Sequence, residues 1–458
     1  MATIINVPAD QPTISAAVTA AAPFDTIQVA PGIYNEIVVV NKPIQLLGAQ
    51  AGVDARIRPG TAAAESIITG VNASGIVQLT NERVVVDGFT IQNNTAGPGI
   101  FTVGTGSGYW IFNNIIRNNV LGIYMLSNGT LETQVRYNFF MSNNQAGAAS
   151  GNGLLSETGS NFWVDNNLFT GHTTASVNLS PTSLTSVNAI VSNNRMVTDN
   201  SIALTNTTNV KIADNTLTNT QGSAIFFGGN TANTDIEGNV IQNGISNGVN
   251  VTTAFVAVPN TNIRMKNNNI SGNSVSGLNL PAGTYAVGGT NLPLDATNNW
   301  WGSPTGPFPL GTGDAVIDPS GSAVITPFLT TPPNSQIIPQ STLTTGPIMV
   351  SSSPIETAAV LLLNDDSISN MQVNVTAFDI STGIKVAYNI FNLTIPPQNV
   401  RYLEIPVGFT YVYELVFNVV GTTLAAISVW NLDSIKVQIP GQHLVASEEL
   451  VLQRLSPL

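Results

Sequence analysis

Three tryptophans are the side chains of this sequence best suited to hold a ligand, because an indole ring packs well against the apolar face of a sugar. They are Trp110, Trp163 and Trp300, the last within the stretch "NNWWGSPTGP". One hypothesis is therefore that they bind a carbohydrate. The structural alternative is that loops cover them, and Trp300 in particular is expected to pack under the loop that follows it.

We predict no catalytic residues. A calcium-dependent lyase needs clustered carboxylates and a basic residue, and a glycosidase needs two carboxylates roughly 5–9.5 Å apart. An active site would require Glu132, Glu157 and Asp199 to converge, and these three acids fall in long, irregular loops of the sequence. The "ERVVVDG" cluster at 82–88 is better explained as solvated turn charges.

The two histidines also predict no site. His172 and His443 fall in different predicted domains, so neither a two-histidine metal site nor a Ser-His-Asp triad is expected within one domain. His172 falls at a turn, so it is expected to be a surface or turn residue. The chain has no cysteine, which excludes disulfides and thiolate sites. We expect no metal and no cofactor.

The charge balance argues against nucleic acid as a partner. Only 9% of the 458 residues are charged, the net charge is −12, and 14 residues are Lys or Arg. Nucleic-acid binding depends on many basic contacts to phosphates. No apolar run has the length of a membrane span, and the first residues do not resemble a signal peptide, so we expect neither.

An asparagine-anchored repeat runs through the sequence. The anchors lie 21 to 31 residues apart, which is typical of solenoid repeats. An additional copy, "FTIQN" at 89–93, fits the frame without the asparagine. The anchors are Asn114, Asn138, Asn167, Asn194, Asn215, Asn239, Asn268 and Asn299.

The positions around each anchor behave like short strands with one buried face. The residues three before and two after the anchor are apolar in every copy, and their neighbours mostly are not. Because no crossover helix fits between copies, this pattern predicts a parallel β-helix of about a dozen coils. The eight anchors would then form a ladder at a bend, where asparagine also tolerates a left-handed backbone.

Charged positions support the same frame. Four places before the anchor, Lys211, Asp235, Arg264 and Asp295 alternate in sign, and two places before it we expect the pairs Arg136–Asp165 and Glu237–Lys266. The frame also sets Trp110 and Trp163 in one outward column, with Gln134 between them. Two strand spacings separate the indoles by roughly 10 Å, which is compatible with stacking on alternate sugars.

The two ends of the chain differ from the repeat. "QPTISAAVTAAA" predicts a short amphipathic helix that caps the first coil. Proline-rich sequence follows the last anchor, and then longer alternating strands predict an antiparallel β-sandwich. We therefore expect an all-β chain with a parallel β-helix and helical cap over 1–310, a linker over 311–341 and a sandwich over 342–458.

The segment 8–49, with "TISAAVTAA" and "PGIYNEIVVV", resembles the opening of proteins with the pectin-lyase-like right-handed β-helix fold. Pectin methylesterases and NosD-type proteins begin similarly, and the Asn-anchored coils resemble β-helix repeats of surface proteins. The resemblance covers about residues 1–310 and implies the fold. The esterase motifs that carry catalytic Asp and Arg are missing, so the resemblance does not imply esterase activity.

The leading expectation from sequence is a non-enzymatic structural protein of a cell or spore surface or a phage tail. The β-helix would be a shaft, and the sandwich would anchor, assemble or bind a ligand. Its partners would be surface proteins or polysaccharide, with homo-oligomers possible, and it would lie outside the cell without a recognisable signal peptide. The alternative is a polysaccharide-binding or polysaccharide-degrading protein, a lyase or a glycoside hydrolase.

Overall fold

The structure is a computed structural model that describes residues 3–58, 60, 64–333, 340–344, 348–349, 357–364, 371–379, 386–396, 399–406, 412–420, 425–432 and 438–444. The chain divides into two compact units. One comprises Met1–Ala51 and Arg58–Ser335, and the other comprises Gly52–Ile57, with the 3₁₀ helix Ala55–Ile57, and Gln336–Leu458.

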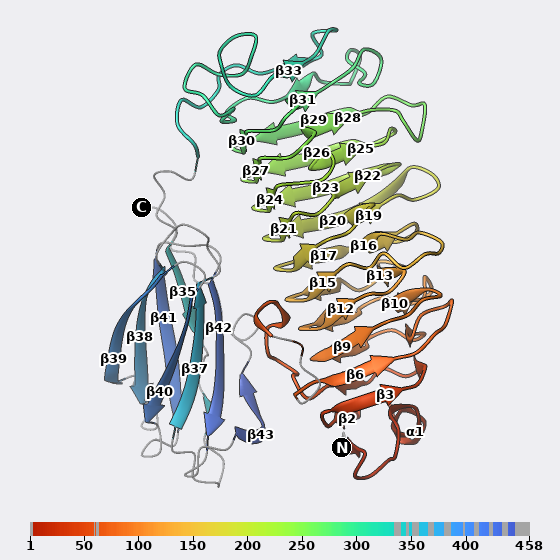
Figure 1. Cartoon of the computed structure of the whole chain (residues 1–458), viewed down its shortest axis with the longest axis vertical. Helices are drawn as coiled ribbons and strands as arrows, with labels where there is room; N and C mark the ends of the chain where they lie inside the picture. The colour runs from red at the N-terminus through yellow and green to blue at the C-terminus, as the bar shows by residue number, and fades with distance from the viewer. Residues whose placement is uncertain are drawn as a thin grey trace. The chain divides into compact units, whose positions relative to one another are not determined.

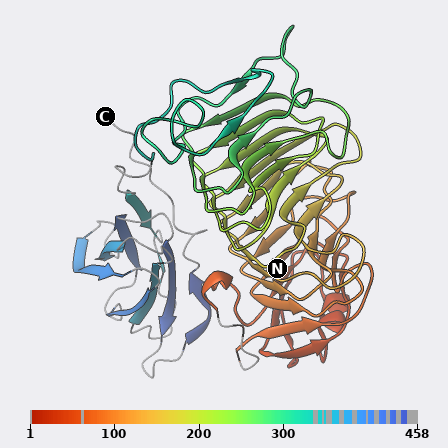
Figure 2. The ribbon, with the colours of Figure 1, turned by 45° about the horizontal axis from the view of Figure 1, so that its top comes forward.

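The first unit is a parallel β-helix, as predicted, with three long sheets that share its coils (Figures 1 and 2). Successive coils pair in parallel in each sheet. Sheet A has 13 strands, sheet B has 10 and sheet C has 11.

The strands of sheet A, in order, are β1 (Ile4–Val7), β2 (Thr26–Val29), β5 (Gln45–Leu47), β8 (Val85–Asp87), β11 (Trp110–Phe112), β14 (Thr133–Arg136), β17 (Phe162–Asp165), β20 (Thr185–Ser192), β23 (Thr207–Ala213), β26 (Ala232–Glu237), β29 (Thr261–Lys266), β32 (Leu294–Asp295) and β34 (Ala323–Val324). Those of sheet B are β3 (Gly32–Asn35), β6 (Ser66–Thr69), β9 (Phe89–Gln92), β12 (Ile115–Arg117), β15 (Phe139–Met141), β18 (Leu168–Thr170), β21 (Arg195–Val197), β24 (Thr216–Thr218), β27 (Val240–Gln242) and β30 (Asn269–Ser271). Those of sheet C are β4 (Val38–Val40), β7 (Val77–Leu79), β10 (Pro98–Thr102), β13 (Leu121–Tyr124), β16 (Asn152–Ser156), β19 (Ala175–Leu179), β22 (Ser201–Leu204), β25 (Ile225–Phe227), β28 (Asn247–Val251), β31 (Ser276–Asn279) and β33 (Val316–Ile317). Ten coils, from the one with β2, β3 and β4 to the one with β29, β30 and β31, contribute one strand to each sheet.

The core of the β-helix is built from the two apolar columns of the repeat. Every residue three before an anchor and two after it is buried, from Val86 and Ile91 in the first copy to Ala296 and Trp301 in the last. Trp301 is therefore a core residue of the last coils, as its inward column predicts. Period-2 alternation on short strands is enough to specify this interior.

The anchor asparagines form one continuous buried ladder. The backbone N–H and Nδ2 of Asn167, for example, both donate to Oδ1 of Asn194 at 3.0 Å. Oδ1 of Asn167 in turn accepts from the backbone N–H and Nδ2 of Asn138 at 2.9 and 3.0 Å. The same pattern runs from Asn114 to Asn299. Each Nδ2 also donates to a backbone carbonyl of the preceding coil, so each amide ties three coils together.

The left-handed backbone at this bend belongs to the residue before the anchor, and the expectation that the anchor adopts it is wrong. Asn113, Tyr137 and Asn166 have φ values of 52°, 56° and 54°. The physical reason is that the anchor itself must direct its N–H and amide along the ladder, while the preceding residue turns the chain.

A second polar ladder lies five residues after each of the first four anchors. Asn119 donates its backbone N–H to Oδ1 of Asn143, and Nδ2 of Asn143 contacts Nε2 of His172 at 3.1 Å. His172 is 2% exposed and donates its backbone N–H to Asp199, whose other oxygen lies 2.8 Å from Nδ1. The expectation that His172 is a surface residue is therefore wrong, because it replaces an asparagine in this buried ladder.

The predicted helical cap is α1 (Ile14–Ala20), a minor element of seven residues, which buries Ile14, Ala17 and Val18. Residues of the first coil hold both of its ends. Glu36 accepts from the backbone N–H groups of Ile14 and Ser15, and Lys42 donates to three carbonyls at the other end. The "GIYNE" element thus has a structural role here, since its glutamate satisfies helix N–H groups that have no partner within the helix.

The last coil extends beyond the "NNWWGSPTGP" stretch. β33 pairs with β31, and β34 pairs with β32, inside the range that the sequence predicts to be linker. The division at 310 and 341 itself stays a prediction.

The second unit has two antiparallel sheets around their own core, in agreement with the predicted sandwich. One sheet has the order β35 (Gln340–Thr344), β41 (Val412–Val420), β38 (Met371–Asp379) and β39 (Val386–Ile395), with β36 (Ile348–Met349) also paired to β41. The other has the order β40 (Asn399–Pro406), β37 (Thr357–Asn364), β42 (Ala425–Leu432) and β43 (Gln438–Leu444). His443 lies in β43, and its side chain is outside the described residues.

Candidate functional site

The outward face of sheet A carries two of the candidate ligand-binding side chains, which the repeat brings together. The strand register aligns one residue per coil in the order Trp110, Gln134, Trp163, Ile190, Lys211, Asp235, Arg264 and Asp295. Trp110 and Trp163 thus occupy one column with Gln134 between them. Because parallel strands lie about 4.8 Å apart, this column presents a side chain at that interval along the helix axis.

Trp110 is the open aromatic of the column. Its side chain is 46% exposed, and it stacks on Phe112 with ring centroids 6.0 Å apart and an interplanar angle of 26°. Phe112 is itself 5% exposed and forms a base for the indole. Trp110 can therefore offer an aromatic face to a ligand in a fixed orientation.

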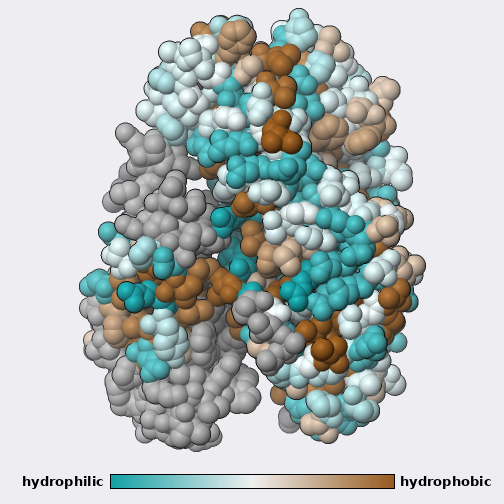
Figure 3. Space-filling view, viewed as in Figure 1, coloured by the Kyte–Doolittle hydropathy of each residue, from teal (hydrophilic) through white to brown (hydrophobic). Residues whose placement is uncertain are grey.

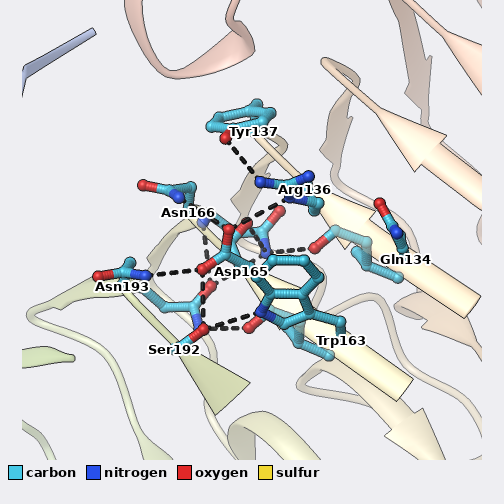
Figure 4. Close-up of polar contacts among 12 residues, drawn as sticks. Gln134, Arg136, Tyr137, Trp163, Asp165, Asn166, Ser192 and Asn193 are labelled. Carbon is cyan, nitrogen blue, oxygen red and sulfur yellow. Dashed lines mark hydrogen bonds and ion pairs between the residues drawn. The ribbon is translucent and has the colours of Figure 1, made fainter. Parts of the chain in front are cut away.

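Trp163 is held within a polar network around the predicted Arg136–Asp165 pair (Figure 4). The guanidinium carbon of Arg136 lies 4.4 Å from the centroid of the indole, and the indole N–H donates to Oγ of Ser192 at 2.9 Å. Arg136 also donates to Asp165 at 3.2 Å. One face and the polar edge of Trp163 are thus occupied, which leaves only its remaining surface for a ligand.

Asp165 is the centre of this network. It is 1% exposed, and its two carboxylate oxygens accept hydrogen bonds from Ser192, Asn193 and Asn166 as well as from Arg136 (Figure 4). A buried carboxylate is stable only when donors and an opposite charge surround it, as they do here. Asp165 therefore fixes the positions of the side chains around Trp163.

Farther along the same face a groove of about 760 Å³ crosses β20, β23, β26, β29 and β32. Four asparagines line it, one on each of four successive strands, and each is six residues before an anchor: Asn188, Asn209, Asn233 and Asn262. Their φ values lie between 46° and 61°. Asn209, Asn233 and Asn262 have no residue paired with them in the strand register. Asparagine suits these bulged, left-handed positions.

The charged residues of the groove occur as ion pairs. Arg264 lies 2.7 Å from Asp235, Lys266 lies 2.7 Å from Asp295, and Lys211 lies 3.7 Å from Glu237, which is beside the groove. Glu237 and Lys266 are register partners on adjacent coils, as predicted, but the ammonium group of Lys266 forms its ion pair with Asp295 of the next coil. The alternation of sign therefore neutralises the groove.

These contacts shift two pKa values. The hydrogen bond and charge of Asp235 raise the pKa of Arg264. Partial burial acts to raise the pKa of Asp295, but hydrogen bonds from Lys266 and Thr297 outweigh it and hold that pKa below its ordinary value. Asp295 is therefore a carboxylate at neutral pH, and it accepts hydrogen bonds.

Trp300 lies apart from this face. It follows the anchor Asn299 and pairs by an isolated bridge with Asn269 of sheet B, where it is partly buried. It therefore does not share a surface with Trp110 and Trp163.

The structure joins none of the three candidate acids to another. Glu132 accepts from Gln134, and Asp199 is buried against His172. Glu157, beyond β16, accepts from the hydroxyl of Tyr124 at 2.5 Å and contributes, after burial, to raising the pKa of that tyrosine to about 12. Within the described residues, no group of three His, Asp or Glu side chains could hold a metal ion.

The surface of the β-helix mixes polar and apolar side chains. In Figure 3 hydrophilic and hydrophobic side chains are interspersed over the β-helix, and only 9% of the chain is charged. The groove differs from this average, because four asparagine amides lie there beside five charged side chains.

Comparison with known proteins gave structural similarity only. No family model matches the chain, and no curated protein matches it. The A-module of the mannuronan C-5 epimerase AlgE6 of Azotobacter vinelandii is 17% identical with a TM-score of 0.44, over 69% of this chain and 93% of that one. ORF18 of Geobacillus virus E2 is 11% identical with a TM-score of 0.41, over 89% and 77%. Pectate lyase Pel9A is 12% identical with a TM-score of 0.34, over 71% and 79%.

These similarities agree with the resemblance to the pectin-lyase-like right-handed β-helix and carry no residue role to this chain. They contradict the expectation of a non-enzymatic structural shaft, since the similar structures are mostly epimerases, lyases and hydrolases of polysaccharides. That expectation is corrected accordingly. Among the described residues, no helix is long and apolar enough to cross a membrane.

Proposed function

We propose that the protein binds an extended polysaccharide along the outward face of sheet A. The observation that carries this proposal is the continuity of the face: the column from Trp110 to Ile190 leads directly into the groove lined by the four asparagines. A ligand with a repeating unit gains a similar set of contacts from each coil, because the coils repeat at about 4.8 Å.

The chemistry of the face suits sugars. Trp110 and Ile190, 46% and 41% exposed, offer apolar surface for ring C–H groups. Each asparagine amide offers both donors and acceptors, which a row of hydroxyls requires. Such sites combine apolar contact with a few placed polar groups.

A panel of soluble polysaccharides in affinity electrophoresis tests the proposal. We expect at least one polysaccharide to retard the full-length protein, and the double variant Trp110→Ala, Ile190→Ala to be retarded less. Ile245→Ala is the matched control, since Ile245 is 58% exposed and lies after β27 in sheet B, off this face. Retardation by no polysaccharide, with the fold intact by circular dichroism, would refute the proposal.

A second candidate function is hydrolysis within the groove. Asp235 and Asp295 occupy one column with Arg264 between them, so two strand spacings separate them by roughly 10 Å. This is close to the roughly 6.5–9.5 Å of an inverting glycosidase. Asp295 is ionised, as a general base must be, although its lowered pKa makes it a weak one. New reducing ends from a bound polysaccharide, abolished by Asp295→Asn, would support hydrolysis, and their absence with the wild-type protein would exclude it for that polysaccharide.

A further inference from the structure

We infer that the groove over β20 to β32 takes a neutral polysaccharide and holds it through the line of asparagine amides. This inference rests on the proposed function and specifies its ligand class. It follows from three features of the groove: its paired charges, the unused hydrogen-bonding groups of its amides and its apolar lining.

The first feature is that every cation of the groove already faces a carboxylate. Arg264, Lys266 and Lys211 pair with Asp235, Asp295 and Glu237. A polyanionic ligand could recruit one of these cations only by releasing its carboxylate, which would remain nearby and repel the ligand. The net charge of −12 adds a repulsive field around the whole chain.

The second feature is the spare capacity of the amides. Nδ2 of Asn209 donates to Ser186 at 2.8 Å. Nδ2 of Asn233 donates to Thr208 at 3.2 Å and to Oδ1 of Asn209 at 3.4 Å. Nδ2 of Asn262 donates to Oδ1 of Asn233 at 3.3 Å. Oδ1 of Asn209 also accepts from Thr208, and Oδ1 of Asn262 accepts from the backbone N–H of Leu292. Oδ1 of Asn188 accepts from Ser186, and its Nδ2 has no hydrogen-bond partner among the described residues. An amide has two donor hydrogens and two lone pairs.

These amides therefore form a row in which each side chain is positioned by its neighbours and keeps at least one donor hydrogen or acceptor lone pair for a ligand. Asn188, Asn209 and Asn233 are exposed, and Asn262 is partly exposed. Uncharged groups that both donate and accept are matched by sugar hydroxyls, whereas a carboxylate only accepts.

The third feature is apolar surface within the groove. Ile190 at one end and Leu292 with Pro293 at the other line it, and the side chain of Leu292 is 68% exposed. Apolar surface between hydrogen-bonding groups fits an uncharged sugar ring better than a uronate, whose charge must stay solvated.

The test measures equilibrium binding of the full-length protein to two sets of probes. The neutral set is a soluble β-glucan, a galactomannan and a xylan, and the anionic set is polygalacturonate and alginate, each at low and high salt. The variant Asn209→Gly, Asn233→Gly removes two amides, and glycine accepts their left-handed backbone. Asn219→Gly is the matched control, because Asn219 is exposed with φ 54° in a turn after β24, off the groove.

We expect a neutral probe to bind with little dependence on salt, and the double glycine variant to bind it about tenfold more weakly, as the loss of two modest hydrogen bonds implies. Asn219→Gly should bind like the wild type. Preferential binding of a polyuronate that salt and Arg264→Gln weaken would overturn this inference and leave polysaccharide binding intact. Binding of a neutral probe that the double glycine variant retains in full would also overturn it. Binding of no probe by the folded protein would overturn the proposed function as well.

Discussion

Replacing Asp165 by asparagine should destabilise the protein far more than the same change at an exposed acid of sheet A. Asp165 is 1% exposed and accepts bonds from four neighbours. The new amide would turn two hydrogens toward groups that donate, and it would leave Arg136, whose side chain is 14% exposed, without its counter-charge. Breaking a buried pair in this way costs about 3–5 kcal/mol.

The matched control is Asp235→Asn. Asp235 also accepts from an arginine on the next coil, but the two side chains are 41% and 55% exposed. An exposed pair contributes about 0–1 kcal/mol, because water and salt screen it. The free energy of unfolding should be measured by urea denaturation of both full-length variants, with circular dichroism and tryptophan fluorescence as probes. Equal losses in the two variants would refute the argument that Asp165 organises this region.

Three further predictions concern the ladders, the cap and the tyrosines. Asn167→Ala should lower the free energy of unfolding by about 3–5 kcal/mol, because it leaves two donors of Asn138 and a backbone carbonyl without partners. Asn178→Ala loses one part-buried hydrogen bond and should lower it by about 1 kcal/mol in the same urea experiment. Similar losses in the two variants would contradict the ladder's role. Lys42→Met should remove the three hydrogen bonds to carbonyls at the C-terminal end of α1. Its melting temperature, measured by scanning calorimetry, should fall more than that of Lys211→Met, whose lysine forms only an exposed ion pair. An unchanged melting temperature in Lys42→Met would show that the helical cap does not need these hydrogen bonds. Burial raises the pKa of Tyr109 and of Tyr124 to about 12, so the stability that their neutral forms contribute is complete below pH 10 and is lost as pH rises through about 12. Ultraviolet absorbance should therefore show a late step of tyrosine ionisation near pH 12, and Tyr109→Phe with Tyr124→Phe should reduce this step by two tyrosines.

The sequence was sufficient for the coils because one period-2 pattern is repeated in register. An apolar residue stands three positions before each anchor and another stands two positions after it, and both are buried in every copy. The strands could therefore be aligned without predicting the loops between them. The columns on the outward face follow from the same frame, which is why Trp110, Gln134 and Trp163 could be aligned.

The remaining features depend on positions whose residue type varies from coil to coil. The second ladder contains Asn119, Asn143, His172 and Asp199 in successive coils, so no single residue type marks it. A search for polar residues five after each of the first four anchors would have found it, and the asparagines six before four successive later anchors would have revealed the groove. Which residue turns the backbone, and which carboxylate a lysine reaches, depend on side-chain geometry that spacing alone does not determine.

Hydroxyl-radical footprinting of the full-length protein with and without polysaccharide tests the central claim most directly. Bound polysaccharide should shield Trp110, Ile190 and Leu292, which are exposed on or beside the outward face of sheet A, and leave Ile245 and Val71 as reactive as before. Shielding of these three side chains together is the result we predict. Shielding elsewhere, or no shielding by any polysaccharide of the neutral and anionic sets, would contradict the assignment of this face as a polysaccharide-binding surface.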